Sequence, residues 1–297
     1  MATLSLVKFE ILKTVIDLGS ITRAGERLNL TQSAISHAVT SLEKEYGFSL
    51  LTRSRSGIKL TPNGREVLLY IEEMLHTNEK MKQVIAEING LEIGTVTIGT
   101  FSSVSVQWLP DIIRTFKQQF PRIEVKLLEG GYQEIHQWIL NGDVDFGFVS
   151  LPISEKFDVI TLKKDKMLCI LPQSHPLSQN DVVSFSDLRN EPFIMPMTKG
   201  GCGLDVRRVY KKHRFTPKTI FELKDDQAII SMVNNGLGVS ILPEMVLSNL
   251  PSTVLAVNIE GKEDYRLIGM AAHSFQRAAP ATQKFIKCVE NWIKEQE

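Results

Sequence analysis

A group of short polar side chains at helical spacing is the first feature of this sequence that could recognise a partner. Most of them stand three or four residues apart, so they share one face of a predicted helix. Glutamine can bond an adenine edge through two atoms, and hydroxyls donate or accept at base edges. The face fits contact with DNA bases, although a helical hairpin with a solvated polar face is the alternative. These residues are Thr31, Gln32, Ser33, Ser36 and Thr40.

Cationic side chains follow this helix. Residues 50–51 and 58–60 read as two short strands around a turn at 54–57, which predicts a β-hairpin. Arg53 and Arg55 lie on or beside this hairpin, where they could hold phosphates. Phosphate contacts would set the orientation of a duplex without reading its sequence.

Hydroxyl side chains also follow three predicted strands further along the chain. Ligands of open α/β sheets bind beyond the carboxyl ends of strands. Two of these places are helix starts, where free N–H groups and the helix dipole favour anions. We therefore expect a small, anionic effector here, with helix capping by the same residues as the alternative. The candidate effector-binding residues are Thr100, Phe101, Ser102, Ser103, Ser150 and Thr198.

Cys202 is a candidate redox residue. It lies between glycines just before a predicted helix, where the pKa of a thiol can fall. The other cysteines, Cys169 and Cys288, are far away in sequence, and no CxxC pair is present. This usage suits a reducing cytosol and argues against a disulfide scaffold or a zinc site.

Signatures of enzymes are weak. The six histidines show no HxxxH or HExxH spacing, and the GxSxG and Walker patterns are absent. Asp143 and Asp145 could do acid–base work, but their position favours a role in bounding a turn. We expect no catalytic residues, no metal and no cofactor.

Two short helices joined by a tight turn must position the polar face. Ser20 can cap the first helix and Thr31 the second, because a hydroxyl accepts a free N–H of the first turn. Asn29 and Leu30 make the turn, and Gly47 ends the second helix.

A long helix comes next. Thr61 and Pro62 open it, and it is predicted to run to about residue 89. Its apolar positions alternate in steps of four and three, which indicates a helix that pairs with a second copy. Packing within its own domain is the alternative. The seam consists of Val67, Ile71, Met74, Asn78, Met81, Ile85 and Ile88.

From Gly94 onward, apolar strands alternate with helices, which predicts a mostly parallel sheet in two α/β lobes. Residues 101–105 read as a polar loop, and 106–120 as a helix that Pro110 interrupts. We expect the chain to cross between lobes near 162–164 and 265–267. The remaining helices are expected at 134–141, 204–212, 226–234 and 281–294. Strands are expected at 95–99, 124–129, 144–149, 159–162, 167–171, 193–195, 219–223, 238–242 and 267–272.

The combination of these motifs resembles one protein family. SITRAGERLNLTQSAISHAVTSLEKEYGFSLLTR followed by LTPNG resembles the winged helix-turn-helix of LysR-type transcriptional regulators. NGDVDFGFV and NNGLGVSILP are similar to the periplasmic-binding-protein-like effector domain of that family. The resemblance covers essentially the whole chain. It implies double-stranded promoter DNA and a small effector as partners, a dimer through the long helix, a tetramer as the working unit and a cytoplasmic location.

The expected fold is therefore α/β overall, in three parts. Residues 1–60 form the winged helix-turn-helix, 61–90 the linker and dimerisation helix, and 91–297 the effector-binding domain. Lobe I comprises 91–163 and 267–297, and lobe II comprises 164–266.

Composition agrees with a globular, DNA-binding chain. Its 297 residues are enough for more than one domain, and the net charge is zero. Residues 1–66 carry nine Lys and Arg against six Asp and Glu, a net +3 that leaves −3 elsewhere. No apolar run approaches the ~18 residues of a bilayer-spanning helix, and the first residues lack a signal-peptide core.

If Arg55 holds a phosphate, Arg55→Ala should weaken binding to all duplexes alike. The slope of log affinity against log salt should fall by about 1, because one fewer phosphate is neutralised. Titrations of labelled duplexes at several salt concentrations measure this slope. A loss confined to particular sequences would contradict the assignment.

Overall fold

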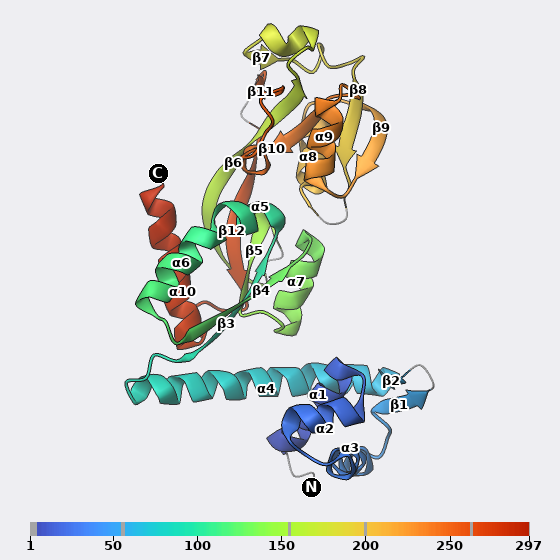
Figure 1. Cartoon of the computed structure of the whole chain (residues 1–297), viewed down its shortest axis with the longest axis vertical. Coiled ribbons are helices and arrows are strands. Elements are labelled where there is room, and N and C mark those ends of the chain that lie inside the picture. The colour runs from blue at the N-terminus through green and yellow to red at the C-terminus, as the bar shows by residue number, and fades with distance from the viewer. Residues whose placement is uncertain (1–4, 55–56, 154–155, 199–200, 262–263, 297) are drawn as a thin grey trace. The chain divides into compact units, whose positions relative to one another are not determined.

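The computed structural model describes residues 5–54, 57–153, 156–198, 201–261 and 264–296 (Figure 1). The chain forms two compact units, Met1–Asn89 and Gly90–Glu297, called here the N-terminal and C-terminal units. In the described part of the chain, no helix combines the length and apolar character needed to cross a membrane. The predicted fold class is confirmed: a winged helix-turn-helix, a long helix and two α/β lobes.

The N-terminal unit packs three helices and a hairpin around one apolar core, and a long helix follows them. The core includes Phe9, Leu12, Val15, Ile35 and Leu42, each at most 1% exposed. Because these side chains recur at helical spacing, each helix turns one apolar face inward. The elements are α1 (Leu6–Leu18), α2 (Ile21–Leu28), α3 (Gln32–Tyr46), β1 (Leu51–Ser54), β2 (Gly57–Leu60) and α4 (Pro62–Ile88).

Local signals fix the helix-turn-helix where the sequence predicted it. The Ser20 hydroxyl accepts a hydrogen bond from the Arg23 N–H, and Thr31 does the same for Ala34 at 3.2 Å. Asn29 adopts a positive φ of 54° in the turn, and Gly47 ends α3 with a φ of 79°. Both are residue types that reach the left-handed region at low cost.

A small group of contacts joins α3, the hairpin and α4. One Glu43 carboxylate oxygen accepts the backbone N–H groups of Leu50 and Leu51, at 2.8 and 3.1 Å. The Thr61 hydroxyl donates to the carbonyl of Ser49 and accepts the N–H of Gly64, both at 2.8 Å. Hydrogen bonds therefore hold α3, the hairpin and the start of α4 together.

The C-terminal unit is built on a mixed sheet. β4, β3 and β5 are parallel, and β12 runs antiparallel to both β5 and β6. β10 and β11 are also antiparallel to β6, while β7 is parallel to β11. The strands are β3 (Gly94–Thr100), β4 (Ile123–Glu129), β5 (Phe146–Leu151), β6 (Asp158–Pro172), β7 (Val182–Val183), β10 (Ser240–Pro243), β11 (Val254–Ile259) and β12 (Tyr265–Ala272).

Helices cover this sheet and divide the unit into two lobes with separate cores. In lobe I, α6 and α10 lie on one side of β3 and α7 on the other (Figure 1). In lobe II, α8 and α9 lie beside the parallel pair β8–β9 (Figure 1). These elements are α5 (Ser102–Gln107), α6 (Leu109–Gln119), α7 (Tyr132–Asn141), α8 (Gly203–Lys212), α9 (Asp226–Asn234), α10 (Pro280–Glu295), β8 (Pro192–Pro196) and β9 (Lys218–Leu223), with 3-10 turns η1 (Pro176–Gln179) and η2 (Glu244–Val246).

The expectation of separate strands at 159–162 and 167–171 was wrong, because β6 is one strand of 15 residues that serves both lobes. The charged residues 163–166 suggested a break. In the structure Asp165 points into the protein and faces Arg266 of β12, so the strand continues through the charged run. The predicted crossings lie within β6 and at the start of β12.

Three further expectations were wrong. The polar loop at 101–105 is mostly helical, because α5 begins at Ser102 and buries Val104. The helix at 106–120 is split at Trp108 into α5 and α6. The sheet is mixed and not mostly parallel, because long-range antiparallel pairing of β12 has no local sequence signal.

Two nearby glycines give a matched test of packing at the start of α8. A Cβ at Gly203 would lie 2.2 Å from the Met197 carbonyl oxygen, whereas one at Gly201 would meet nothing within 4 Å. Gly203→Ala should therefore destabilise the C-terminal unit by about 1–3 kcal/mol, and Gly201→Ala by no more than about 0.5 kcal/mol.

Urea unfolding measures both variants. Tryptophan fluorescence reports on this unit alone, because Trp108, Trp138 and Trp292 all belong to it. Equal midpoints for the two variants would contradict the close packing at Gly203.

Candidate functional site

The start of α3 presents the predicted polar face to solvent. Thr31, Gln32, Ser33 and Thr40 are exposed, and Ser36 is half-buried. The opposite face, with Ile35, Val39 and Leu42, is buried in the core. The hydroxyls of Thr31 and Ser33 lie 3.0 Å apart, so the cap also orders the first exposed turn.

The hairpin beside α3 forms as expected. Thr52 pairs with Lys59 and Arg53 with Ile58 across β1 and β2. Of Arg53 the structure describes only the backbone, and Arg55 lies outside the described residues. Lys59 is exposed on β2 and adds a cation to the same hairpin.

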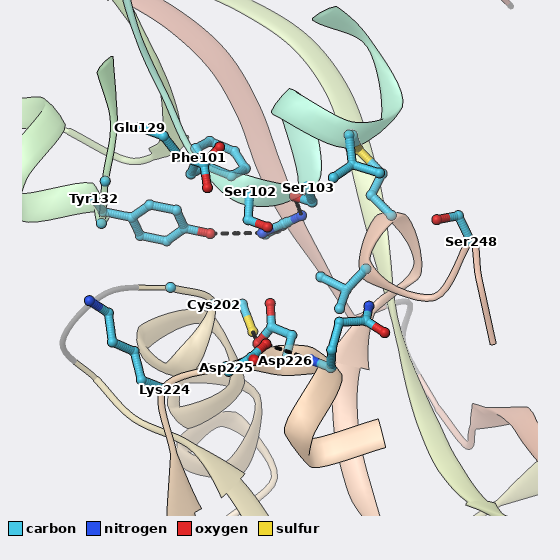
Figure 2. Close-up of a pocket in the computed structure, with 18 of the residues that line it drawn as sticks. Phe101, Ser102, Ser103, Glu129, Tyr132, Cys202, Lys224, Asp225, Asp226 and Ser248 are labelled. Carbon is cyan, nitrogen blue, oxygen red and sulfur yellow. Dashed lines mark hydrogen bonds between the residues drawn. The ribbon is translucent and has the colours of Figure 1, made fainter. Parts of the chain in front are cut away.

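A cavity of about 530 Å³ lies between the lobes of the C-terminal unit (Figure 2). Lobe I contributes the start of α5 and the end of β4 with the turn after it. Lobe II contributes the starts of α8 and α9 and the segment after η2. Its volume is in the range of small-molecule sites. The lining groups with polar chemistry are Ser102, Ser103, Glu129, Tyr132, Cys202, Lys224, Asp225, Asp226, Gln227, Ser248, Asn249 and Arg266.

The structure brings part of the predicted effector set to this cavity. Phe101, Ser102 and Ser103 line it. Thr100 is fully buried beneath, with its hydroxyl 3.2 Å from that of Ser105. Ser150 and Thr198 do not line this cavity, and the Ser150 hydroxyl is engaged elsewhere.

Arg266 is the buried cation of the cavity wall, with 2% of its surface exposed. Its Nε donates to Asp165 at 2.7 Å, Nη1 to the Tyr132 hydroxyl at 2.8 Å, and Nη2 to the Ser103 hydroxyl at 2.7 Å. Burial acts to lower the pKa of Arg266, but Tyr132 and Asp165 hold it above its usual value. The guanidinium therefore keeps its charge, as a paired buried ion.

Asp205 of α8 bridges the lobes. Its carboxylate accepts the Tyr132 hydroxyl at 2.9 Å and the Ser150 hydroxyl at 2.8 Å, both from lobe I. It also accepts Arg208 Nη1 at 2.8 Å, and the same nitrogen contacts the Leu151 carbonyl oxygen. Burial raises the pKa of Tyr132, so this hydroxyl keeps the proton that it donates. Tyr132 thus connects the cavity cation to the interlobe bridge.

Sequence reasoning missed the two residues at the centre of this network, Arg266 and Asp205. The position of Arg266 beside the predicted apolar strand 267–272 was a usable signal, because an Arg at a buried strand needs a partner for its charge. Asp205 gave no comparable signal, since acidic residues are common in the first turn of a helix.

Cys202 lies at the start of α8, at 2% exposure, with Sγ 3.7 Å from Asp226 Oδ1. Burial, and then the negative charge of Asp226, raise the pKa of this thiol well above its usual value. The expected lowering of the pKa is therefore wrong. A redox role gains no support from this environment, because the thiolate is the reactive form.

Comparisons with known proteins cover most of the chain. A family model described as "Bacterial regulatory helix-turn-helix protein, lysR family" matches residues 6–65. A second, described as "LysR substrate binding domain", matches residues 89–294. The HTH-type transcriptional regulator YvbU of Bacillus subtilis is 35% identical over 286 residues, which are 96% of this chain and 97% of that protein.

Solved structures share the fold. A full-length OxyR variant from Pseudomonas aeruginosa has a TM-score of 0.79 at 20% identity, covering 99% of this chain and 96% of that one. The LysR family regulator CbnR in complex with its target DNA has a TM-score of 0.69 at 20% identity, covering 97% and 100%.

The Tyr132 hydroxyl can be tested for its part in the interlobe network. Tyr132→Phe leaves a guanidinium N–H and a buried carboxylate each without one partner, so the C-terminal unit should lose about 1–3 kcal/mol of stability. Urea unfolding followed by tryptophan fluorescence measures the loss. Tyr265→Phe is the control, because Tyr265 is 41% exposed as a residue and the substituted ring keeps its contact with Lys164. Similar midpoints for both variants would count against the network.

Proposed function

This chain belongs to the LysR family of helix-turn-helix transcriptional regulators, and we propose that it reads promoter DNA with the exposed start of α3 under control of a small anionic effector. As a family member it binds DNA, carries an effector-binding domain and is a regulator and not an enzyme. The observation that carries the proposal is the division of α3 into a buried apolar face and an exposed face of Gln32, Ser33 and Thr40.

The proposed reading geometry follows from that division. The first residues of a recognition helix meet base edges in the major groove. Gln32 stands first on α3 and is exposed, so it can bond adenine through two atoms, while Ser33 and Ser36 contact neighbouring edges. Arg53 and Arg55 hold the phosphates of the DNA backbone beside these contacts. Thr31 and Thr40 lie at the edges of the surface that contacts the DNA.

Two copies are proposed to pair through α4. In its second half, Met81, Ile85 and Ile88 are 53%, 50% and 78% exposed. A run of exposed apolar side chains along one helix favours a partner. Pairing would bring two reading helices to a palindromic site, and a further pairing would give the tetramer that the family resemblance implies. The protein acts in the cytoplasm, where promoter DNA is accessible.

An anionic effector fits the Arg266 wall of the cavity. A guanidinium has five N–H donors, and Asp165, Tyr132 and Ser103 engage four of them. One N–H has no partner among the described residues. A carboxylate on the effector could take it, together with the hydroxyls of Ser102 and Ser103.

Effector binding can regulate DNA binding only if it favours one arrangement of the protein over another. The cavity walls come from both lobes, so a ligand that touches both changes the balance between closer and wider lobe arrangements. Asp205 and Tyr132 are proposed to be the contacts that this change affects first.

Selection from random duplexes tests the DNA-reading role. The protein should enrich two half-sites at a fixed spacing, and Gln32→Ala should relax one base pair of each half-site at a cost of about 1–3 kcal/mol. Gln118→Ala, an exposed glutamine of α6, is the matched control and should leave the selected sequence unchanged. Salt-sensitive retention without enrichment, or an identical preference for the Gln32→Ala variant, would refute the assignment.

A further inference from the structure

More acidic than basic side chains line the cavity, and one of the basic side chains is already in an ion pair. Glu129, Asp225 and Asp226 line it, against Lys224 and Arg266. Arg266 is already paired with Asp165, so its charge is largely balanced within the wall. An effector that is only an anion would meet Arg266 on one side and carboxylates on the other.

Each side of the cavity carries both kinds of charge. Glu129 lies on the same side as Tyr132, and Lys224 lies on the same side as Asp226 (Figure 2). Figure 2 shows Ser102, Ser103 and Tyr132 on one side and Cys202, Asp225 and Asp226 on the other. Arg266 bonds to Tyr132 and Ser103, so its charge belongs to the first side. A ligand that reaches from Ser103 to Asp226 therefore meets a cation and hydroxyl donors at one end and a carboxylate at the other.

The two aspartates differ in what already satisfies them. Asp225 caps α9, because its carboxylate accepts the Gln227 N–H at 2.9 Å. Asp226 has the Cys202 thiol at 3.7 Å as its hydrogen-bond partner, and a thiol is a weak donor. Among the described residues, no Lys, Arg or His forms an ion pair with Asp226. Burial raises the pKa of Asp226, although Arg266 acts to lower it.

A carboxylate in this position is only partly compensated, because no cationic side chain among the described residues forms an ion pair with it. Asp226 lies in the first turn of α9, where the helix dipole favours a negative charge. The alternative to ligand binding is that Asp226 only stabilises this end of the helix. Burial nevertheless raises the pKa of this carboxyl, because its charged form loses contact with water. A bound ammonium would supply both the charge and the donors that Asp226 lacks.

Resting on the effector-binding role proposed above, we infer that the effector is a zwitterion of the α-amino acid class. Its carboxylate lies against Arg266 and the hydroxyls of Ser102 and Ser103. Its ammonium lies against Asp226. Asp226 is then the residue that separates amino acids from the corresponding 2-oxo acids, which keep the carboxylate but carry no cation.

A ligand panel tests this class on the full-length protein. The twenty protein amino acids are compared with their 2-oxo acids, where these exist, and with their decarboxylated amines. Thermal unfolding screens the panel, and calorimetry measures affinity for the compounds that raise the midpoint. At least one amino acid should bind, and both of its counterparts should bind at least tenfold more weakly.

Asp226→Asn provides the decisive variant. Its affinity for the selected amino acid should fall at least tenfold, while its affinity for the 2-oxo acid should stay the same or rise. The variant's own unfolding midpoint confirms that it folds. Asp111→Asn is the control, because Asp111 is an exposed partner of Arg114 on α6 and does not line this cavity. It should bind as the wild type does.

The outcomes separate this inference from the broader proposal. A 2-oxo acid that binds as tightly as its amino acid would refute the zwitterion and leave the anionic effector standing. Unchanged amino acid affinity in Asp226→Asn would refute the role of Asp226. Stabilisation by amines alone would overturn both the zwitterion and the anionic effector. Stabilisation by no compound of the panel would overturn the amino acid class and leave the anionic effector standing.

Discussion

The buried ion pair between Arg266 and Asp165 is the interaction on which the C-terminal unit depends. The two residues face each other on β12 and β6, the adjacent strands that extend from one lobe into the other. Asp165 also accepts the Met245 N–H, so the pair fixes the turn that follows β10. A buried charge without its partner is costly. The pair therefore sets the register of these strands and the position of the guanidinium in the cavity wall.

A single network extends from that pair to the interlobe bridge. Arg266 donates to Tyr132, Tyr132 donates to Asp205, and Asp205 holds Ser150 and Arg208. Whatever changes the hydrogen bonding of Arg266 in the cavity also changes the charge environment of the contacts between lobes. Such coupling needs no long path through the core, because ligand cavity and bridge share Tyr132.

Local signals made the N-terminal unit predictable. Ser20, Thr31 and Gly47 act within their own turns, so the sequence alone located the helices that carry the polar face. In the C-terminal unit, Phe101, Ser102 and Ser103 were found because they follow a strand. Arg266, Asp205 and Asp226 were not, because their roles depend on partners up to 163 residues away. For the same reason the sequence predicted two strands where β6 is one, since only pairing with Arg266 explains a buried Asp165.

The carboxylate of Glu43 has a consequence for how the protein can respond to a signal. By accepting two backbone N–H groups at the start of the hairpin, it holds the hairpin in place relative to the exposed face of α3, the surface proposed to read bases. A single protomer therefore keeps one spacing between the exposed face of α3 and the hairpin. On the function proposed above, discrimination between promoters that differ in half-site separation then depends on how protomers assemble and not on the single protomer.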